Sequence, residues 1–128
     1  MDPFQILKNA KTILLVDWPD IGLPMAVLNA GFEVLSYSPD QYSKAEVKDG
    51  KVVFNQIEGR PGQVDVVNIF RPEAEYDEII KKHVLPLGAK TVWLHPPVTL
   101  KFKNELAEKY GIEFVEGVNI ADVAAEIK

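Results

Sequence analysis

Asp17, Arg71 and His95 are the residues of this sequence whose types and positions could support chemistry on a ligand. Each follows directly after a segment rich in apolar residues that predicts a strand, at residues 12–16, 64–70 and 91–94. A carboxylate and an imidazole can act as a general acid–base couple, and a guanidinium binds phosphate through paired N–H donors. Ligands of open α/β sheets bind beyond the carboxyl ends of the strands. If the three runs are strands of one parallel sheet, these side chains lie at that edge.

The turn after the first run is where we expect a ligand first, because the first strand–helix turn is the usual phosphate site in such sheets. Its candidate binding residues are Asp17, Trp18, Pro19 and Gly22. Asp17 either faces a hydroxyl group or cation of the ligand or caps the turn. Trp18 either stacks on a base or plugs the cleft.

The turns after the second and third runs supply further candidates. Pro39 and Asp40 follow the second run, where an aspartate can accept hydrogen bonds from ribose hydroxyls, although Ser-Pro-Asp is also an ordinary turn. Phe70 and Arg71 end the third run. Arg71 is the best phosphate partner at this edge, or else it forms a structural ion pair with a helix acid such as Glu75.

His95 and Pro96 end the fourth apolar run. His95 either forms an acid–base couple with Asp17 or is a polar strand end, and the second interpretation is favoured. His83 lies in a Lys-rich helix end, where a cation complements the helix dipole, so we expect a structural role. Because the two histidines are far apart and cysteine is absent, the sequence predicts no dedicated zinc site.

Apolar runs alternate with helical patterns along the whole chain. Strands are predicted at residues 12–16, 32–38, 64–70, 91–94 and 112–115, and helices near 2–9, 23–30, 71–85, 99–111 and 119–127. In the fourth helix we expect Thr99 to cap the start and Phe102, Leu106 and Tyr110 to face the core. Asp49-Gly50 predicts a tight hairpin between two short β-prone runs. The alternation predicts an α/β fold with a doubly wound parallel sheet of about five strands.

Composition narrows the function classes. The 128 residues suit one domain, 1–128, with 47% hydrophobic and 26% charged residues. A net charge of −5 argues against nucleic-acid binding, and the lack of cysteine excludes disulfides and thiol catalysis. No stretch reaches the ~20 apolar residues of a membrane span, and the N-terminus lacks a secretory h-region. We therefore expect a cytoplasmic protein that binds neither membrane nor nucleic acid.

Three sequence pieces carry a resemblance to a known family. They are Gly31-Phe32-Glu33-Val34 with Pro39, the run VDVVNIFR at 64–71, and Gly88-Ala89-Lys90 with Trp93. In order and spacing, over roughly residues 5 to 116, the chain resembles the stand-alone CoA-binding domains, which are Rossmann-like and related to the CoA-binding domain of succinyl-CoA synthetase. The resemblance implies CoA bound through its ADP part. The diphosphate would lie at the first turn and the adenosine near the ends of the second and third strands.

The sequence departs from that family where a ligand would bind. Asp17 stands where the family has glycine, the first turn is shorter, and Asp40 replaces a basic residue. Three hypotheses follow. The first is non-enzymatic binding of CoA or a related adenine nucleotide. The second is a divergent member that has lost the nucleotide and acts as a protein-interaction module, with the hairpin edge allowing a homodimer. The third is a small enzyme using Asp17 and His95.

Overall fold

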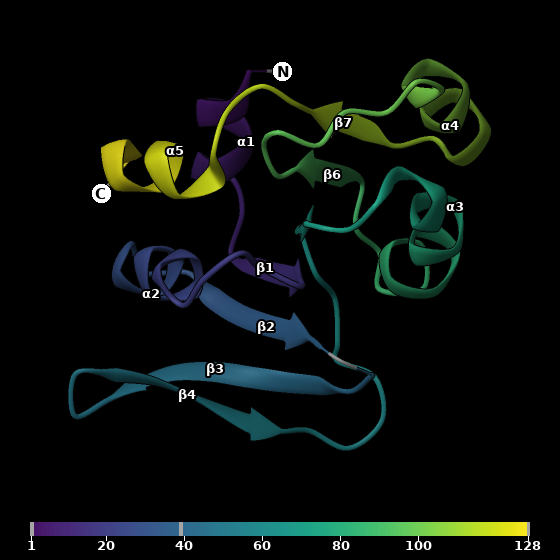
Figure 1. The fold of residues 1–128 in the computed structure, drawn as a ribbon. Coiled ribbons are helices and arrows are strands. Elements are labelled where there is room, and N and C mark those ends of the chain that lie inside the picture. The colour runs from purple at the N-terminus through teal and green to yellow at the C-terminus, as the bar shows by residue number, and fades with distance from the viewer. Residues whose placement is uncertain (1, 39, 128) are drawn as a thin grey trace.

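A sheet of seven strands runs through the molecule, with helices on both of its faces (Figure 1). The structure is a computed structural model and describes residues 2–38 and 40–127. The strand order is β4-β3-β2-β1-β5-β6-β7. The strands are β1 Thr12–Val16, β2 Glu33–Tyr37, β3 Tyr42–Lys48, β4 Lys51–Gln56, β5 Val66–Ile69, β6 Thr91–Leu94 and β7 Glu113–Val115.

Helices lie between the parallel strands β1 and β2, β5 and β6, and β6 and β7, as well as before β1 and after β7. They are α1 Pro3–Lys8, α2 Gly22–Asn29, α3 Tyr76–Ile79, α4 Lys103–Tyr110 and α5 Ile120–Ile127. A 3₁₀ turn, Glu73–Glu75, leads into α3, and a π-helical turn, Ile80–Val84, continues it. As expected, the Asp2 side chain caps α1 by accepting from the Gln5 N–H, and the Asn119 side chain accepts from the Ala121 N–H at the start of α5.

The five parallel strands, β2-β1-β5-β6-β7, each lie within a predicted strand, so the predicted α/β fold is confirmed. The expected count of about five strands is wrong for the whole sheet, because the hairpin β3–β4 joins it along β2. Asp49 and Gly50 turn the hairpin with φ values of 53° and 76°, the left-handed conformations that a tight two-residue turn requires.

Two hydrophobic layers hold the sheet between its helices. Helices α1, α2 and α5 cover one face, and α3 and α4 cover the other (Figure 1). Strand β1 is buried throughout, as its unbroken apolar run predicted. The predicted apolar face of α3 and its continuation is buried as well, at Tyr76, Ile79, Ile80 and Val84. This packing fixes the strand ends that carry the candidate site.

The start of α4 differs from the prediction. The helix begins at Lys103 without a side-chain cap, so Thr99 does not cap it, and Phe102 is 59% exposed. Leu100 enters the core instead, while the neighbouring Lys101 N–H donates to Glu73 at 2.7 Å. These contacts hold residues 99–102 as a loop. Leu106 and Tyr110 pack against the core as expected. Among the described residues, no helix is both long and apolar enough to cross a membrane.

Candidate functional site

Asp17 begins the turn at the carboxyl end of β1. Its φ of 62° is left-handed, a conformation that favours glycine and that aspartate tolerates better than most residues. Its N–H donates to the Tyr37 carbonyl at 3.3 Å, so the β1 turn stays joined to the end of β2. This backbone geometry gives a physical reason for a glycine at this position, and here the position carries a carboxylate.

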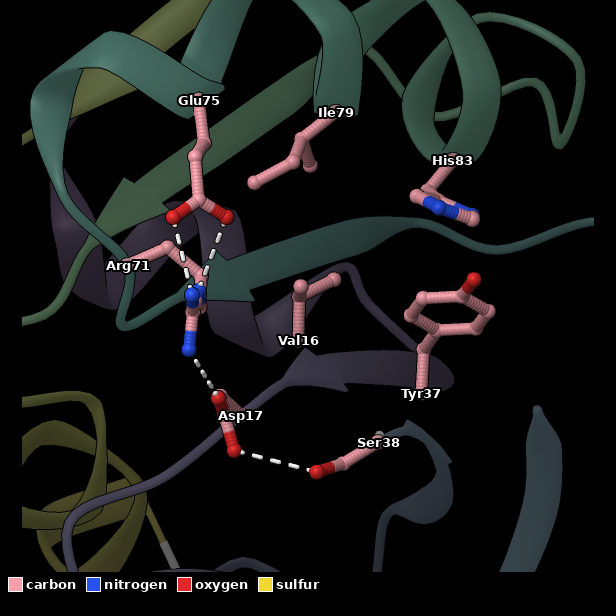
Figure 2. A pocket seen from close by; sticks show the side chains of 8 residues that line it. All are labelled: Val16, Asp17, Tyr37, Ser38, Arg71, Glu75, Ile79 and His83. Carbon is pink, nitrogen blue, oxygen red and sulfur yellow. Dashed lines mark hydrogen bonds and ion pairs between the residues drawn. The ribbon is translucent and has the colours of Figure 1, made fainter. Parts of the chain in front are cut away.

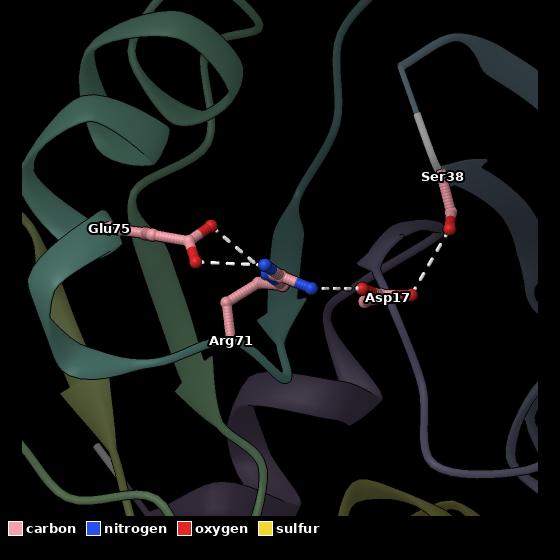
Figure 3. A network of polar contacts seen from close by, with 4 residues as sticks. All are labelled: Asp17, Ser38, Arg71 and Glu75. Atoms are coloured by element: carbon pink, nitrogen blue, oxygen red, sulfur yellow. Dashed lines mark hydrogen bonds and ion pairs between the residues drawn. The ribbon is translucent and has the colours of Figure 1, made fainter.

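A network of charged side chains crosses the ends of β1, β2 and β5 (Figure 3). The Arg71 Nε and one terminal nitrogen donate to both Glu75 oxygens at 3.0 and 2.8 Å. The other terminal nitrogen donates to Asp17 at 2.8 Å, and the Ser38 hydroxyl donates to the second Asp17 oxygen at 3.1 Å. The hydrogen bonds to Glu75, which have the larger effect, and to Asp17 raise the pKa of Arg71 above its ordinary value. The predicted ion pair with Glu75 is confirmed, and phosphate binding by Arg71 stays a prediction.

A cavity of about 290 Å³ opens beside this network (Figure 2). The polar network forms one side, and apolar and aromatic side chains form the rest. The lining residues are Val16, Asp17, Tyr37, Ser38, Arg71, Glu75, Ile79 and His83. Such a cavity suits a ligand with a ring at one end and hydroxyl or phosphate groups at the other.

The aromatic end of the cavity is formed by Tyr37 and His83, with ring centroids 4.0 Å apart (Figure 2). The Tyr42 hydroxyl forms a hydrogen bond with His83 Nδ1, behind this pair. The pKa of His83 is lowered mainly by burial and also by the positive charge of Lys82. Burial, together with the nearby Tyr37, raises the pKa of Tyr42 to about 12. Near neutral pH the imidazole is therefore neutral, so it can stack against a ring without adding charge.

A second cavity, of about 370 Å³, adjoins the first across the Asp17–Arg71 ion pair, because both residues line both cavities. Its other walls are largely apolar, from Trp18, Phe70, Pro72 and Val98. Trp18 is half-buried and stacks on Phe54 of β4, with ring centroids 5.2 Å apart and an interplanar angle of 16°. Four predicted site residues, Asp17, Trp18, Phe70 and Arg71, thus surround adjoining cavities.

The predicted residues at the end of β6 lie in different surroundings. His95 is 3% exposed and lines neither cavity; its ring meets Phe70 edge-on, and its Nδ1 lies 3.5 Å from the Asn68 amide nitrogen. Burial lowers the His95 pKa. Pro96 lines a separate cavity of about 450 Å³ together with residues of α1 and α5. The structure therefore separates His95 and Pro96 from the Asp17–Arg71 network.

The remaining predicted residues shape the turns. The Gly22 N–H donates to Asp20 at 2.9 Å, and a Cβ on Gly22 would lie 2.9 Å from the same oxygen, so a larger residue would displace the Asp20 side chain. Pro19, in that turn, and Asp40 are both exposed. Pro39 lies outside the described residues.

Some cavity residues were not predicted as ligand-binding. Glu75, Ile79 and His83 all line the first cavity from the segment after β5. They are spaced four residues apart, so they share one helix face, and that spacing was a readable signal. Tyr37 and Ser38 lie at the end of β2, where the strand-end rule could have found them. In the part of the chain that the structure describes, no group of three acidic or histidine side chains could hold a metal ion.

Solved structures share this fold. A Thermus thermophilus protein described as cell-free ID.343 has 21% identity and a TM-score of 0.72, with 100% of both chains covered. Prb, a PH1109 protein redesigned for binding, has 20% identity and a TM-score of 0.74, covering 98% of this chain and 89% of that one. A hypothetical protein from Pyrococcus horikoshii OT3 has 19% identity, a TM-score of 0.68 and the same coverage. At these identities the likeness shows the fold alone.

No curated protein matches the sequence. The profile of the CoA binding domain family, however, matches residues 23–120, well over half of the chain. The matched stretch begins after the turn that carries Asp17 and includes Arg71 and the whole of α3. The chain belongs to the CoA binding domain family.

Proposed function

We propose that this protein binds CoA, or a related adenine nucleotide, at the carboxyl edge of its sheet and has no catalysis of its own. The observation that carries the proposal is the pair of adjoining cavities at the ends of β1, β2 and β5, in a chain that belongs to the CoA binding domain family. Open α/β sheets bind ligands in this crevice.

The chemistry of the first cavity suits the adenosine part. The adenine ring would lie against Tyr37 and His83, since the faces of aromatic rings can stack on a planar base. Ser38 and Asp17 would then face the ribose, whose hydroxyls can donate to the carboxylate. The largely apolar second cavity, next to Trp18 and Phe70, would take the pantetheine arm.

Arg71 is the residue that we assign to the diphosphate. A guanidinium carries five N–H donors, of which Glu75 takes two and Asp17 one, so two remain for phosphate oxygens. Two carboxylates and one guanidinium leave the described rim of the cavities with a net negative charge. We therefore expect binding to be weak and to depend on Arg71.

Isothermal titration calorimetry with CoA, ADP and adenosine tests this function. CoA should bind more tightly than ADP, since only CoA fills both cavities. Arg71→Gln should weaken CoA binding about tenfold to about a hundredfold, because hydrogen bonds to charged groups contribute about 1.5 to 3 kcal/mol. Arg60→Gln is the matched control, since Arg60 is the other arginine of the chain and lines neither cavity. No heat of binding at millimolar CoA, or equal affinities for both variants, would contradict the proposal.

The two alternative functions, a protein-interaction module and a small enzyme, differ in their structural support. A protein-interaction module without nucleotide binding is favoured by one observation, the pairing of Arg71 with two carboxylates, and it predicts no response to any of the three ligands. An enzyme using Asp17 and His95 gains no such support. The side-chain contacts described for His95 are with Asn68 and Phe70, and those of the Asp17 carboxylate are with Arg71 and Ser38.

A further inference from the structure

Strand β4 is an unusually open edge of the sheet. It has six residues, Lys51–Gln56, of which only Lys51 is charged and none is proline. The opposite edge, β7, has three residues and begins with Glu113. Natural edge strands are usually kept short, charged or interrupted by proline, because their unpaired backbone groups can pair with another chain. Strand β7 follows that rule and β4 does not.

The pairing within the hairpin shows which β4 backbone groups point outward. The Ile57 N–H donates to the Tyr42 carbonyl at 3.1 Å, so these two residues form a hydrogen-bonded pair. Hydrogen-bonded pairs alternate along antiparallel strands, so Lys51, Val53 and Asn55 direct their backbone groups toward β3. The N–H and C=O groups of Val52, Phe54 and Gln56 therefore point away from the sheet.

Phe54 lies at the centre of this outward set. It is 37% exposed, and one face of its ring stacks on Trp18. Val47, on the same face of the hairpin, is 45% exposed and pairs with Val52. An apolar strip thus borders the open edge on the side of α2. In Figure 1 the hairpin lies at the margin of the molecule, with β4 outermost.

We propose that β4 pairs with β4 of a second copy of this chain, antiparallel and about a twofold axis at Phe54. The outward groups of Val52, Phe54 and Gln56 then find partners in the same three residues of the other copy. A twofold interface uses the same patch on both copies, and this outward set is complementary to itself in that register. The result is one continuous sheet through two subunits.

Side chains and charges agree with this register. Phe54 meets Phe54 of the second copy across the axis, which joins two Trp18–Phe54 stacks into one row of aromatic rings, and cross-strand aromatic pairs are favourable. Lys51 lies opposite Ile57 and beside Glu58 of the second copy, so no like charges face each other. The proposal is independent of ligand binding and of the proposed function.

Sedimentation velocity over a wide range of protein concentration tests the dimer. The parent chain should show a monomer–dimer equilibrium. Phe54→Lys should weaken it about tenfold or more, because it removes the aromatic pair and places like charges opposite each other. Phe102→Lys is the matched control, an equally drastic change at a phenylalanine that is 59% exposed outside the hairpin. A parent chain that stays monomeric, or a dimer that Phe54→Lys leaves intact, would overturn the proposal.

A cysteine cross-link tests the register without disturbing the charge. The chain has no cysteine, so a single introduced thiol can pair only with its copy in a second molecule. Directly opposed residues of a hydrogen-bonded antiparallel pair have Cα atoms about 5.5 Å apart, within disulfide range. Phe54→Cys should form a disulfide dimer on mild oxidation, and Val53→Cys should not, because Val53 faces Asn55 of the second copy. Efficient cross-linking of Val53→Cys alone would refute the register.

Discussion

Removing the charge of Asp17 should tighten CoA binding. In the proposed site this carboxylate lies near both the ribose and the diphosphate, and an asparagine there keeps an oxygen that can accept from a ribose hydroxyl. Arg71 offsets only part of the Asp17 charge because Glu75 holds two of the Arg71 donors. At a separation of about 6 Å and an effective dielectric constant between about 80 and 20, one carboxylate repels one phosphate charge by about 0.7 to 3 kcal/mol. Asp17→Asn should therefore lower the CoA dissociation constant by about threefold to about a hundredfold.

The same change should leave the protein folded. Asparagine, like aspartate, tolerates the left-handed conformation at φ 62°. The Arg71–Asp17 pair is about one-third exposed on both sides, so its loss costs about 1 kcal/mol or less. Comparison with Asp17→Gly separates the effect of charge from that of the backbone. Asparagine removes only the negative charge, whereas glycine removes both the charge and the backbone strain. A gain in affinity shared by both variants belongs to the charge.

Calorimetry with CoA at low and high salt is the assay. The gain should shrink at high salt, since screening weakens the repulsion. Asp49→Asn is the matched control: Asp49 has the same left-handed backbone, with φ 53°, and lies in the hairpin turn outside both cavities. An unchanged or weaker CoA affinity of Asp17→Asn, with Asp49→Asn equal to the parent chain, would refute the placement of the diphosphate at this turn.

Two further predictions concern stability. The pKa values of His83 and His95 are lowered mainly by burial, so each histidine takes up a proton on unfolding below its ordinary value of about 6.5. The free energy of unfolding should therefore be highest above about pH 6.5 and should decrease at lower pH, by up to about 1.4 kcal/mol per pH unit for each histidine. Urea denaturation at a series of pH values should show a smaller decrease for His83→Gln than for the parent chain. Tyr76→Phe should cost about 1 to 2 kcal/mol in the same assay, because the fully buried hydroxyl donates to the Ile69 carbonyl at 2.9 Å. Tyr110→Phe, whose hydroxyl meets Asp77 in a half-buried contact, should cost less, and equal losses would contradict this reasoning.

The parallel sheet was predictable because its signals are local. An unbroken apolar run such as residues 13–16 is typical of a strand buried on both faces of a covered parallel sheet, and Asp49-Gly50 supplies the turn geometry of the hairpin. The start of α4 was not predictable in this way. Leu100 enters the core in place of Phe102, and the neighbouring Lys101 N–H donates to Glu73, which lies 28 residues earlier in the chain and so outside any local pattern.

In the candidate site, too, the local features could be predicted and the features that depend on tertiary packing could not. The strand-end rule located Asp17, Phe70 and Arg71, because the carboxyl ends of neighbouring parallel strands share an edge. It said nothing of side-chain direction, and so it grouped His95 with them although His95 lies against Asn68 in the interior. Direction depends on register and packing, which are properties of the assembled sheet.

Fold and ligand chemistry are therefore encoded in different residues of this chain. The apolar runs and the left-handed turn after β1 set where the cleft lies, and the turn keeps its backbone conformation although it carries aspartate. The side chains of Asp17, Arg71 and Glu75 set the charge of the cleft, and all three residues lie outside the strands. The fold thus accounts for the position of the cleft. In the function that we propose, the charge balance around Arg71 decides whether a diphosphate is accepted there.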